Sequence, residues 1–295
     1  MMRMPAVAGM FYEAEPIACR KHVRELFRSA DEIAHGQASA QAPAGCVGGL
    51  VPHAGWVYSG AVAALTLQAL ADDEFGGTFV LLGAIHAASG AKAMVDSADS
   101  WRTPLGDIPI DKDLAAALVD ASADIVFDAD AHTREHSLEV QAPLIQMLCP
   151  RASILPILVP PSPVAADAGR QIGRILKPRS GDVRVVGSTD LTHYGPRYGI
   201  TPAGVGPQGL QWATANDQRL LKLIEGLQQD KIVADTASTH SACGGGAIAA
   251  TIAACRELGA TTGTVLRHTN SSQVLAAHGQ RDTANAVGYA SVVFS

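Results

Sequence analysis

The sequence predicts an α/β fold built around a mainly parallel β-sheet. Short apolar runs typical of strands alternate along the chain with amphipathic segments typical of helices, an order that produces βαβ units. Apolar residues make up 47% of the chain and aromatic residues only 5%, while Ala and Gly are abundant. This composition suits helices of small residues packed closely on a buried sheet. Several apolar runs also end in histidine or aspartate, which places polar groups at the carboxyl ends of strands.

The predicted elements alternate from the N-terminus onward. Strand patterns lie near residues 46–51, 78–83, 92–96, 124–127, 153–159, 182–187, 262–267 and 286–294. Helical patterns lie near residues 16–35, 59–70, 111–121, 137–148, 163–176, 213–227 and 243–258. Ser59 is the candidate N-cap of the second helix. Residues 1–15 are expected to be irregular, and the segments 37–45 and 201–209, rich in Gly, Pro or Ala, are expected to be loops.

The bulk properties exclude several classes of function. The chain has 295 residues, enough for one large domain or two small ones, and a net charge of −6. Because no basic block stands out, nucleic acid is not an expected partner. The apolar runs are far shorter than the roughly 20 residues of a membrane helix, and the N-terminus lacks a signal-peptide pattern. Five scattered cysteines without a CxxC pair argue against a disulfide framework and for a reducing, cytoplasmic location.

Two apolar strands end in histidine. His53 lies in the segment GGLVPHAGWVYSG (48–60), and His86 ends the segment VLLGAIH (80–86). Adjacent parallel strands are about 5 Å apart, and their carboxyl ends meet at one edge of the sheet. Taken alone, each histidine is as readily a loop residue bonded to the backbone as a metal ligand or acid–base group. Taken together, the two imidazoles can share one ion.

A third strand end adds an aspartate and another histidine. The segment VVGSTDLTH (185–193) places Asp190 and His193 at the same predicted edge. His193 is a candidate general base, because a neutral imidazole is available near physiological pH. Asp190 can orient an imidazole or join the ligand set. In the plainer interpretation, Asp190 caps a turn and His193 stacks locally.

The start of a predicted helix carries further polar candidates. In the segment REHSLEVQ (134–141), Glu135 and Glu139 are one helical turn apart. One interpretation is a helix start with a solvated acidic face. The other places His136 and Glu139 at the rim of the site as substrate-binding or ligand-supporting groups, and the sequence favours neither. No supporting pattern surrounds His22, His35, His268 and His278.

Cys243 precedes a run of three glycines at the start of a helical pattern. A thiol in this position would have a lowered pKa, because the helix dipole and free N–H groups favour the thiolate, which is a soft metal ligand. The glycines can instead cradle an anion, and the simplest role for Cys243 alone is a small buried residue between helix and sheet. No GxSxG elbow, P-loop or GxGxxG motif follows a strand, which argues against serine hydrolases, P-loop NTPases and dinucleotide enzymes.

These residues lie within motifs that resemble the Memo family, whose bacterial and archaeal members are often labelled AmmeMemoRadiSam system protein B. The resemblance spans nearly the whole chain and identifies residues 1–295 as a single Memo-like domain. Several ordered motifs carry it: PAVAGMFY (5–12), PHAGWVYSG (52–60), WRTPLG (101–106), EHSLE (135–139), STDLTHYG (188–195) and CG (243–244).

The resemblance implies a three-layer α/β/α sandwich similar to that of class III extradiol dioxygenases. Those enzymes hold Fe(II) with two histidines and a glutamate and use another histidine as the acid–base group. By this resemblance, His53 and His86 are the histidine ligands and Cys243 replaces the glutamate. His193 matches the catalytic histidine, and Asp190 matches the family's site aspartate.

One motif departs from the commoner family pattern. Where that pattern reads Gly-Pro-Ser-His-His after the second strand, this chain reads GAIHA (83–87), so one of the two histidines is missing. His86, the implied ligand, is kept. The pocket wall beside His86 is changed, so the family resemblance does not imply that this chain shares a substrate with other members.

The leading hypothesis is a non-haem Fe(II) oxidoreductase, a dioxygenase that uses O₂ on a small phenolic or other aromatic substrate. Its catalytic residues would be His193, Asp190 and His136. Because a thiolate also binds copper, copper-linked redox chemistry is an alternative. Another is a zinc-dependent hydrolase, since two histidines, a cysteine and a water can coordinate a catalytic zinc ion. The remaining alternative is a non-catalytic Memo-like scaffold that binds a partner in the same groove. We expect a small-molecule substrate and neither nucleic acid nor membrane as partner, and a homo-oligomer is compatible with the sequence.

Overall fold

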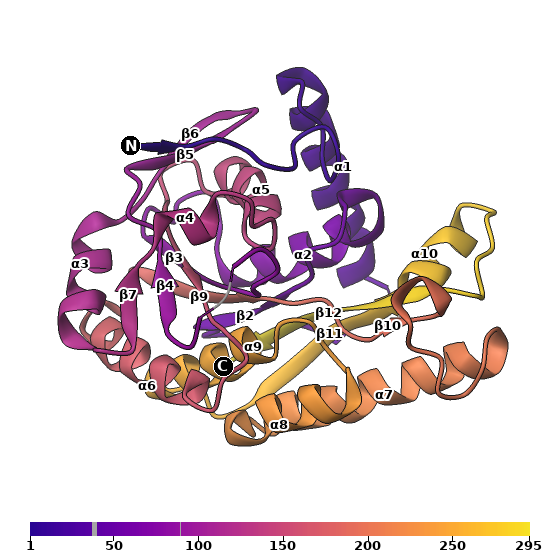
Figure 1. Cartoon of the computed structure of the whole chain (residues 1–295). Helices are drawn as coiled ribbons and strands as arrows, with labels where there is room; N and C mark the ends of the chain where they lie inside the picture. The colour runs from indigo at the N-terminus through magenta and orange to yellow at the C-terminus, as the bar shows by residue number, and fades with distance from the viewer. Residues whose placement is uncertain (37–39, 89) are drawn as a thin grey trace.

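The computed structural model describes residues 1–36, 40–88 and 90–295. Over these ranges the chain forms a mixed α/β fold with one sheet of nine strands and another of three (Figure 1). Of the loop predicted at 37–45, residues 37–39 lie outside the described ranges, and 40–45 contain neither helix nor strand. None of the described helices combines the length and the apolar character that a bilayer crossing requires.

The larger sheet has the strand order β10-β12-β2-β9-β3-β8-β4-β7, and β11 pairs with β12. Its strands are β2 (Gly48–Val51), β3 (Thr78–Gly83), β4 (Ala93–Val95), β7 (Ile125–Phe127), β8 (Ser153–Leu158), β9 (Val183–Ser188), β10 (His193–Tyr194), β11 (Gly263–Asn270) and β12 (Ala286–Phe294). The smaller sheet, in the order β1-β5-β6, consists of β1 (Met2–Arg3), β5 (Ser100–Thr103) and β6 (Gly106–Pro109).

The larger sheet is mixed, whereas the alternation of strands and helices predicts a mainly parallel one. The central strands β2, β9, β3 and β8 pair in parallel. Antiparallel pairs join β12 to β2, β10 and β11, and β4 to β8. The direction of these outer strands depends on long-range pairing, which leaves no trace in the local hydrophobic pattern.

The helices of the described residues are α1 (Pro16–Ala34), α2 (Trp56–Leu70), α3 (Lys112–Ala121), α4 (Ala129–His132), α5 (Ala142–Leu148), α6 (Ala165–Leu176), α7 (Pro207–Glu225), α8 (Gln229–Thr239), α9 (Gly245–Glu257) and α10 (Ser271–Ala277). Two of them pack against strand β2 of the larger sheet. A Cβ atom on Gly48 of β2 would lie 2.5 Å from Cys255 of α9, and one on Gly49 would lie 2.7 Å from Thr66 of α2. Since successive strand residues point to opposite faces, α2 and α9 lie on opposite sides of β2.

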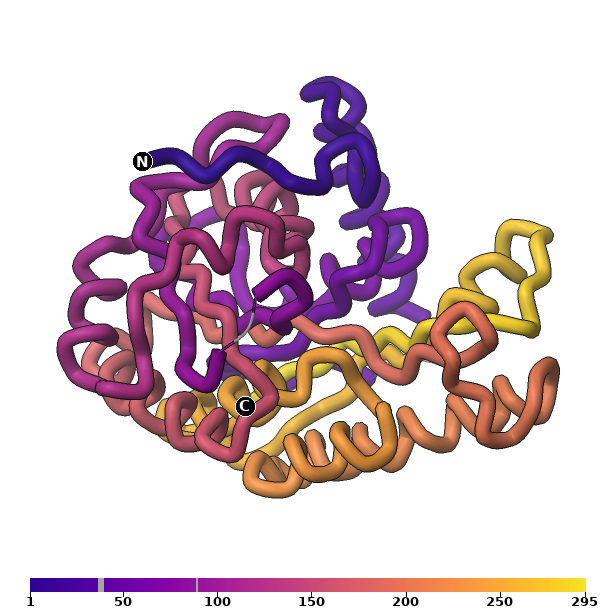
Figure 2. The backbone as a smooth tube through the Cα atoms, in the orientation of Figure 1, coloured from indigo at the N-terminus to yellow at the C-terminus, as the bar shows by residue number. Residues whose placement is uncertain are grey.

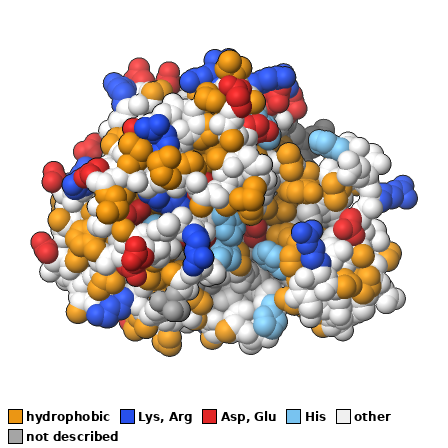
Figure 3. Space-filling view, turned by 45° about the horizontal axis from the view of Figure 1, so that its top comes forward, with side chains coloured by type: hydrophobic (Ala, Val, Ile, Leu, Met, Phe, Trp, Pro, Cys, Tyr) orange, Lys and Arg blue, Asp and Glu red, His pale blue; other side chains and the backbone are white. Residues whose placement is uncertain are grey.

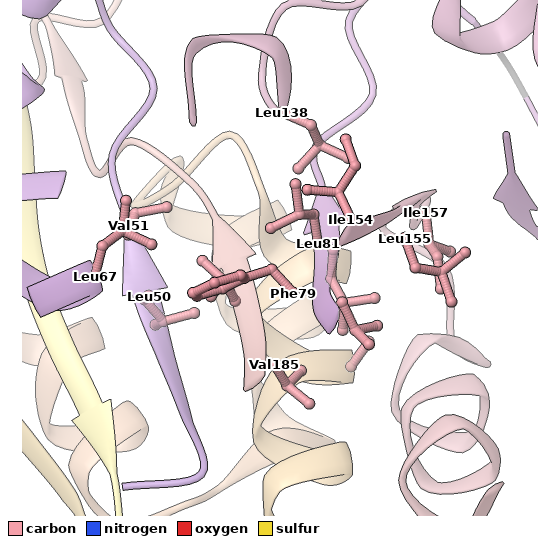
Figure 4. Packing of buried hydrophobic residues seen from close by; sticks show 14 of the residues in the cluster. Leu50, Val51, Leu67, Phe79, Leu81, Leu138, Ile154, Leu155, Ile157 and Val185 are labelled. Atoms are coloured by element: carbon pink, nitrogen blue, oxygen red, sulfur yellow. The ribbon is translucent and has the colours of Figure 1, made fainter. Parts of the chain in front are cut away.

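The central strands are buried on both faces, which explains their continuous apolar sequence. All six residues of β3 are buried. Figure 4 shows Phe79 and Leu81 of β3 among buried side chains of other strands, among them Leu50 of β2 and Ile154 of β8. Each fully buried side chain of this kind contributes about 1.5–3 kcal/mol relative to its exposed state. This rigid centre fixes the ends of β2, β3 and β9.

Small residues allow two helices to approach closely on the α9 side. A Cβ atom on Gly169 of α6 would lie 2.3 Å from the carbonyl oxygen of Ala250 of α9, and one on Gly173 would lie 2.6 Å from that of Ala254. No larger side chain fits at either glycine without moving a backbone. The high Ala and Gly content noted in the sequence therefore has a direct packing role.

Several elements differ from the sequence prediction. The hairpin of β5 and β6 and the helices α4, α8 and α10 were not predicted, because each is short or lacks a clear apolar period. Helix α2 begins at Trp56, so Ser59 lies inside it and donates a hydrogen bond to the Ala54 carbonyl (3.0 Å) instead of capping the helix. Helix α7 begins at Pro207, within the predicted loop 201–209.

The N-terminal segment runs along the outside of the smaller sheet before it enters α1 (Figure 2). Its strand β1 pairs in parallel with β5, from Met2 beside Ser100 to Arg3 beside Trp101. The Arg3 guanidinium lies 4.2 Å over the Trp101 ring, a cation–π contact. Although mostly irregular, as predicted, this segment is thus fixed to the body of the protein.

Candidate metal centre

Three neighbouring strands end at the same edge of the larger sheet. Val51, the last residue of β2, and Gly83, the last residue of β3, both lie beside Ser188, the last residue of β9. His53, His86 and Asp190 follow these ends by two or three residues. The convergence expected from the strand-end pattern is therefore present in the structure.

His53, His86 and Cys243 form a group whose candidate ligand atoms all lie within 4.8 Å of one another. The Cys243 Sγ atom is 3.2 Å from His53 Nε2, and the rings of His53 and His86 are 5.2 Å apart. Bonds of about 2.0–2.3 Å to one metal ion place ligand atoms about 3–4 Å from each other. The Cys243–His53 distance lies in this range, and the three donors together form a candidate site for a single ion.

Hydrogen bonds fix which nitrogen of His53 is free. Ser188 Oγ donates to the Ser137 carbonyl (2.6 Å), so its single proton is already used. The distance between Ser188 Oγ and His53 Nδ1 is 3.1 Å. Since the hydroxyl can only accept a hydrogen bond there, Nδ1 must carry the ring proton. Nε2 then presents its lone pair toward Cys243. Burial, followed by the charges of His86 and His136, holds the pKa of His53 well below its ordinary value, which keeps the ring neutral and able to ligate.

Glu135 orients the second histidine. Its carboxylate accepts hydrogen bonds from His86 Nδ1 (2.9 Å) and from the His86 backbone N–H (2.6 Å). It also accepts from the backbone N–H groups of His136 and Ser137, both at 2.9 Å. Nε2 is therefore the His86 nitrogen that would bind a metal, in exchange for the proton it carries in the metal-free protein, and this arrangement is common for metal-binding histidines.

The two partners shift each other's pKa in opposite directions. Burial lowers the pKa of His86, but hydrogen bonds to Cys243 and Glu135 outweigh it and raise this pKa to about 10. Burial raises the pKa of Glu135, but the hydrogen bond and charge of His86 and the backbone N–H groups hold it well below its usual range. The carboxylate is therefore ionised and keeps a proton on His86 Nδ1.

His136 stands next to both histidine donors. Its ring is 4.5 Å from that of His86 and 5.4 Å from that of His53. Together with His86 and Glu135 it forms a second group of possible ligands. Burial and then the charge of His86 lower the pKa of His136, so it is a neutral side chain. The structure places it beside the donors, as one of the two sequence interpretations expects.

Asp190 supports the turn that carries His53. Its Oδ1 atom accepts a hydrogen bond from the His53 backbone N–H at 2.8 Å, and the backbone N–H of Ala54 also donates to this carboxyl group. Burial raises the pKa of Asp190 to about 7, against the lowering effect of these two bonds. A carboxyl group with this pKa can hold or release a proton near neutral pH.

His193 lies on β10 with its Nδ1 atom 3.1 Å from the Leu191 carbonyl. The carbonyl can only accept, so Nδ1 carries the proton and Nε2 is a free acceptor. Burial lowers the pKa of His193, which keeps it neutral. The Tyr198 ring lies nearly perpendicular to this ring, with 5.0 Å between the ring centroids. These features suit a base that takes a proton from a bound molecule.

A cleft of about 390 Å³ opens onto these groups. Aromatic side chains and one arginine line it beside the donors: Phe11, Tyr58, Tyr198, Tyr289 and Arg197. Figure 3 shows histidine side chains gathered in a hollow near the middle of one face of the molecule. This volume is in the range of small-molecule sites.

Residues 3–293 match the model of the Memo-like protein family. The chain belongs to the Memo family. It is 34% identical to the MEMO1 family protein MTH_45 of Methanothermobacter thermautotrophicus, over 98% of this chain and 99% of that one. It is also 34% identical to a MEMO1 family protein of Thermococcus onnurineus, over 100% of this chain and 99% of that one. The structure of an uncharacterized protein, JW3007 of Escherichia coli K12, matches with 15% identity and a TM-score of 0.45, over 75% of this chain and 86% of that one.

In this Memo-family chain the histidine centre is built without a second histidine after His86. Ala87 follows it, and the ring nearest to His86 comes instead from His136, on a different segment. The altered motif therefore leaves the three-donor group intact.

Two supporting residues of this Memo-family site were not predicted from the sequence. Glu135 was noted only as part of an acidic face, and Ser188 only as a neighbour of Asp190. Each acts on an imidazole more than 45 residues away along the chain, as the separations of 49 and 135 residues show. A local pattern cannot reveal such a partner. The one sequence signal is the position of Ser188 directly after the strand predicted near 182–187.

Glu139 does not lie at the rim of the site, as one interpretation of the sequence proposed. It is only 1% exposed and forms an ion pair with Arg3 (2.9 Å). It also accepts hydrogen bonds from the Ala6 and Val7 backbone N–H groups and from the Tyr12 hydroxyl. Glu139 therefore anchors the N-terminal segment and makes no contact with the histidine donors.

Proposed function

We propose that this Memo-family protein is a metal-dependent oxidoreductase that binds Fe(II) through His53, His86 and Cys243. In this proposal it uses O₂ to oxidise a small phenolic or other aromatic molecule, as a dioxygenase does. One observation carries the proposal: two imidazoles whose Nδ1 atoms are held by other residues, and one thiol, present ligand atoms within 4.8 Å of one another beside the cleft. Two histidines and one anionic ligand leave coordination positions open on iron for substrate and O₂.

The proposal includes a relationship to the class III extradiol dioxygenases. We infer a three-layer α/β/α arrangement like theirs, with Cys243 in the place of the ligand carboxylate. The positions of α2 and α9 on opposite sides of β2 support this inference. The parallel centre of the sheet supports it as well.

The protein's own groups would bind and prepare the substrate. Phe11 and Tyr198 offer apolar surface in the cleft for an aromatic ring. His193 Nε2 would accept the proton of the substrate hydroxyl, since its Nδ1 is already bonded to a carbonyl. Asp190, with a pKa of about 7, would hold a proton near this reaction and keep the His53 turn in place. His136 would contact the bound molecule from the side of His86.

The cysteine ligand distinguishes this centre from a carboxylate one. A thiolate donates more charge than a carboxylate and is itself oxidisable. It also favours copper, which makes copper the second candidate for a redox centre. Metal analysis of the protein purified from its natural source, with iron and copper measured against protein concentration, decides between the two.

The experiment that tests the proposal is anaerobic reconstitution with Fe(II), followed by O₂ uptake with a panel of catechols. We expect iron near one equivalent per chain and O₂ consumption with a ring-opened product. The His193→Gln variant should keep its iron and lose most of its rate. His35→Gln, at an exposed position, is the matched control and should behave as wild type. Full iron loading with no uptake and no product for any catechol would overturn the dioxygenase proposal.

A zinc-dependent hydrolase is the second candidate. The observation in its favour is the donor set itself, because two histidines and one cysteine with a water satisfy four-coordinate zinc. His193 and Asp190 would then handle the proton of the attacking water. Ester or amide hydrolysis by the zinc-loaded protein without O₂ would support this candidate. Its absence, together with O₂-dependent turnover of the iron form, would exclude it.

A non-catalytic binding protein is the third candidate. The features in its favour are the tyrosines of the cleft and Arg197, which suit an aromatic or anionic side chain. In that case His53→Ala would leave every activity of the protein unchanged. A loss of activity in this variant, with the fold retained, would exclude the candidate.

A further inference from the structure

A second and larger cavity lies beside the metal cleft. Its volume is about 870 Å³, and residues of α1, α2, β11 and α10 line it. Tyr58 and Leu275 line both this cavity and the metal cleft, and thus form the wall between them. None of the three metal donors lines the larger cavity. A ligand bound there would be separate from the proposed reaction.

The lining of this cavity is basic, although the chain as a whole carries a net charge of −6. Two arginines and three histidines line it: Arg28, Arg267, His22, His268 and His278. Glu25 is the one acidic residue among those lining it. A local excess of basic groups on an acidic protein attracts anions.

Arg267 is the strongest indication of a ligand. It is half-buried on β11, and none of the described residues accepts a hydrogen bond from its guanidinium or forms an ion pair with it. Every other arginine that is buried or half-buried within the described ranges has such a partner: Arg3, Arg170, Arg179, Arg184 and Arg219. Partly removing a cation from water is costly unless an anion or acceptor compensates. An anion in the cavity would supply this compensation.

Two of the histidines are held by carboxylates. His22 Nδ1 lies 2.7 Å from Glu13, and His268 Nε2 lies 2.9 Å from Asp217. Each ring is thereby fixed, and its other nitrogen remains available in the cavity lining. Such a nitrogen donates to an anion when the ring is cationic. The carboxylates thus hold two potential donors in place.

The remaining lining can accommodate an apolar group. Ile33 and Leu275 are half-buried, and Tyr58 is 39% exposed, so each has surface left for contact. The combination of basic groups with this apolar surface is typical of sites for amphipathic small molecules. We propose that this cavity binds a small organic anion, with its phosphate or carboxylate group at Arg267 and Arg28 and its apolar body against Tyr58, Ile33 and Leu275.

The test is calorimetric titration of the metal-free protein with three probes that share one ring system. They are 1-naphthyl phosphate, 1-naphthoate and the neutral 1-naphthalenemethanol. We expect at least one anion to bind and the alcohol to bind at least about tenfold more weakly, because it cannot form a charge-assisted hydrogen bond. The tighter of the two anions identifies the preferred head group.

Variants locate the bound anion. Arg267→Gln should weaken binding about tenfold or more, and Arg28→Gln should weaken it less because Arg28 is exposed. Arg197→Gln, which changes the arginine of the metal cleft, is the matched control and should bind as wild type. Circular dichroism confirms that each variant is folded.

Three results would overturn the proposal. The first is that neither anion binds the wild-type protein. The second is that the alcohol binds as tightly as the anions. The third is that Arg197→Gln weakens binding while Arg267→Gln does not, which would place the ligand in the metal cleft. Because the titrations use metal-free protein, none of these results depends on the proposed oxidoreductase activity.

Discussion

Glu135 and Glu139 lie four residues apart, and both are almost fully buried, at 2% and 1% exposed. Their partners differ. Glu139 faces Arg3, whose side chain is only 5% exposed, and two backbone N–H groups of the N-terminal segment. Glu135 faces His86, whose side chain is 34% exposed and lines the cleft. Glu139 thus forms a buried ion pair, whereas Glu135 holds a side chain that remains accessible from the cleft.

The comparison shows that burial and residue type do not decide whether a carboxylate is structural or functional. The decisive feature is whether its partner keeps a free donor or acceptor at a cleft. Arg3 also donates to the carbonyls of His132, Met4 and Glu135, and its side chain is too buried to reach a ligand. His86 has Nε2 left after Nδ1 bonds to Glu135. We therefore expect Glu139 to govern stability and Glu135 to govern metal affinity.

The largest expected effect on stability is that of Glu139→Gln. The variant leaves the Arg3 guanidinium buried without a counter-charge, which costs about 3–5 kcal/mol of unfolding free energy. Tyr12, whose pKa is raised by burial and by the charge of Glu139, would also lose a strong acceptor. Urea unfolding measures the loss. Metal bound per folded chain should stay at the wild-type value, and a selective loss of metal would show that Glu139 belongs to the site after all.

The largest expected effect on the centre is that of His53→Ala, which removes one of three donors. We expect iron content after gel filtration to fall close to zero. His35→Ala, at an exposed helix end, is the control and should retain its iron. Retention of a full equivalent by His53→Ala would place the metal elsewhere, for example at the group of His86, Glu135 and His136.

Glu135→Gln should weaken metal binding less than His53→Ala does. An amide can still accept from the backbone, but it is a weaker acceptor for His86 Nδ1, so metal affinity should fall about 10–100-fold. Competition with a chromophoric chelator measures this affinity. An unchanged affinity, with stability reduced as in Glu139→Gln, would remove the distinction between the two glutamates.

The sequence predicted the positions of the candidate metal ligands better than it predicted the residues that hold those ligands in place. The continuous apolar runs predict buried parallel strands where β2, β3 and β9 lie, so His53, His86 and Asp190 could be expected at one sheet edge. Cys243 came from the family resemblance, because nothing in its local sequence links it to a distant strand. The strands β11 and β12 were predicted, but their antiparallel pairing and the partners of Glu135 and Glu139 could not be. Each depends on contacts between segments far apart in the chain.

The last prediction concerns the pH dependence of stability, to which Asp190 should contribute. The pKa of Asp190 is raised from 3.8 to about 7, so the folded protein binds this proton more tightly than the unfolded chain. Its contribution to stability is complete below the unfolded pKa and is lost as the pH rises through about 7. The free energy of unfolding of the metal-free protein should therefore fall as the pH rises from 3.8 to about 7. Asp190→Asn should flatten this slope, and an identical slope in the variant would show that Asp190 is not its source.

X-ray absorption at the iron edge of the Fe(II)-reconstituted protein identifies the atoms that bind the metal. We expect two nitrogen ligands at about 2.1 Å and one sulfur at about 2.3 Å, with the sulfur signal absent in Cys243→Ser. A spectrum from the wild-type protein with oxygen and nitrogen neighbours alone, or a sulfur signal that survives Cys243→Ser, would contradict this expectation.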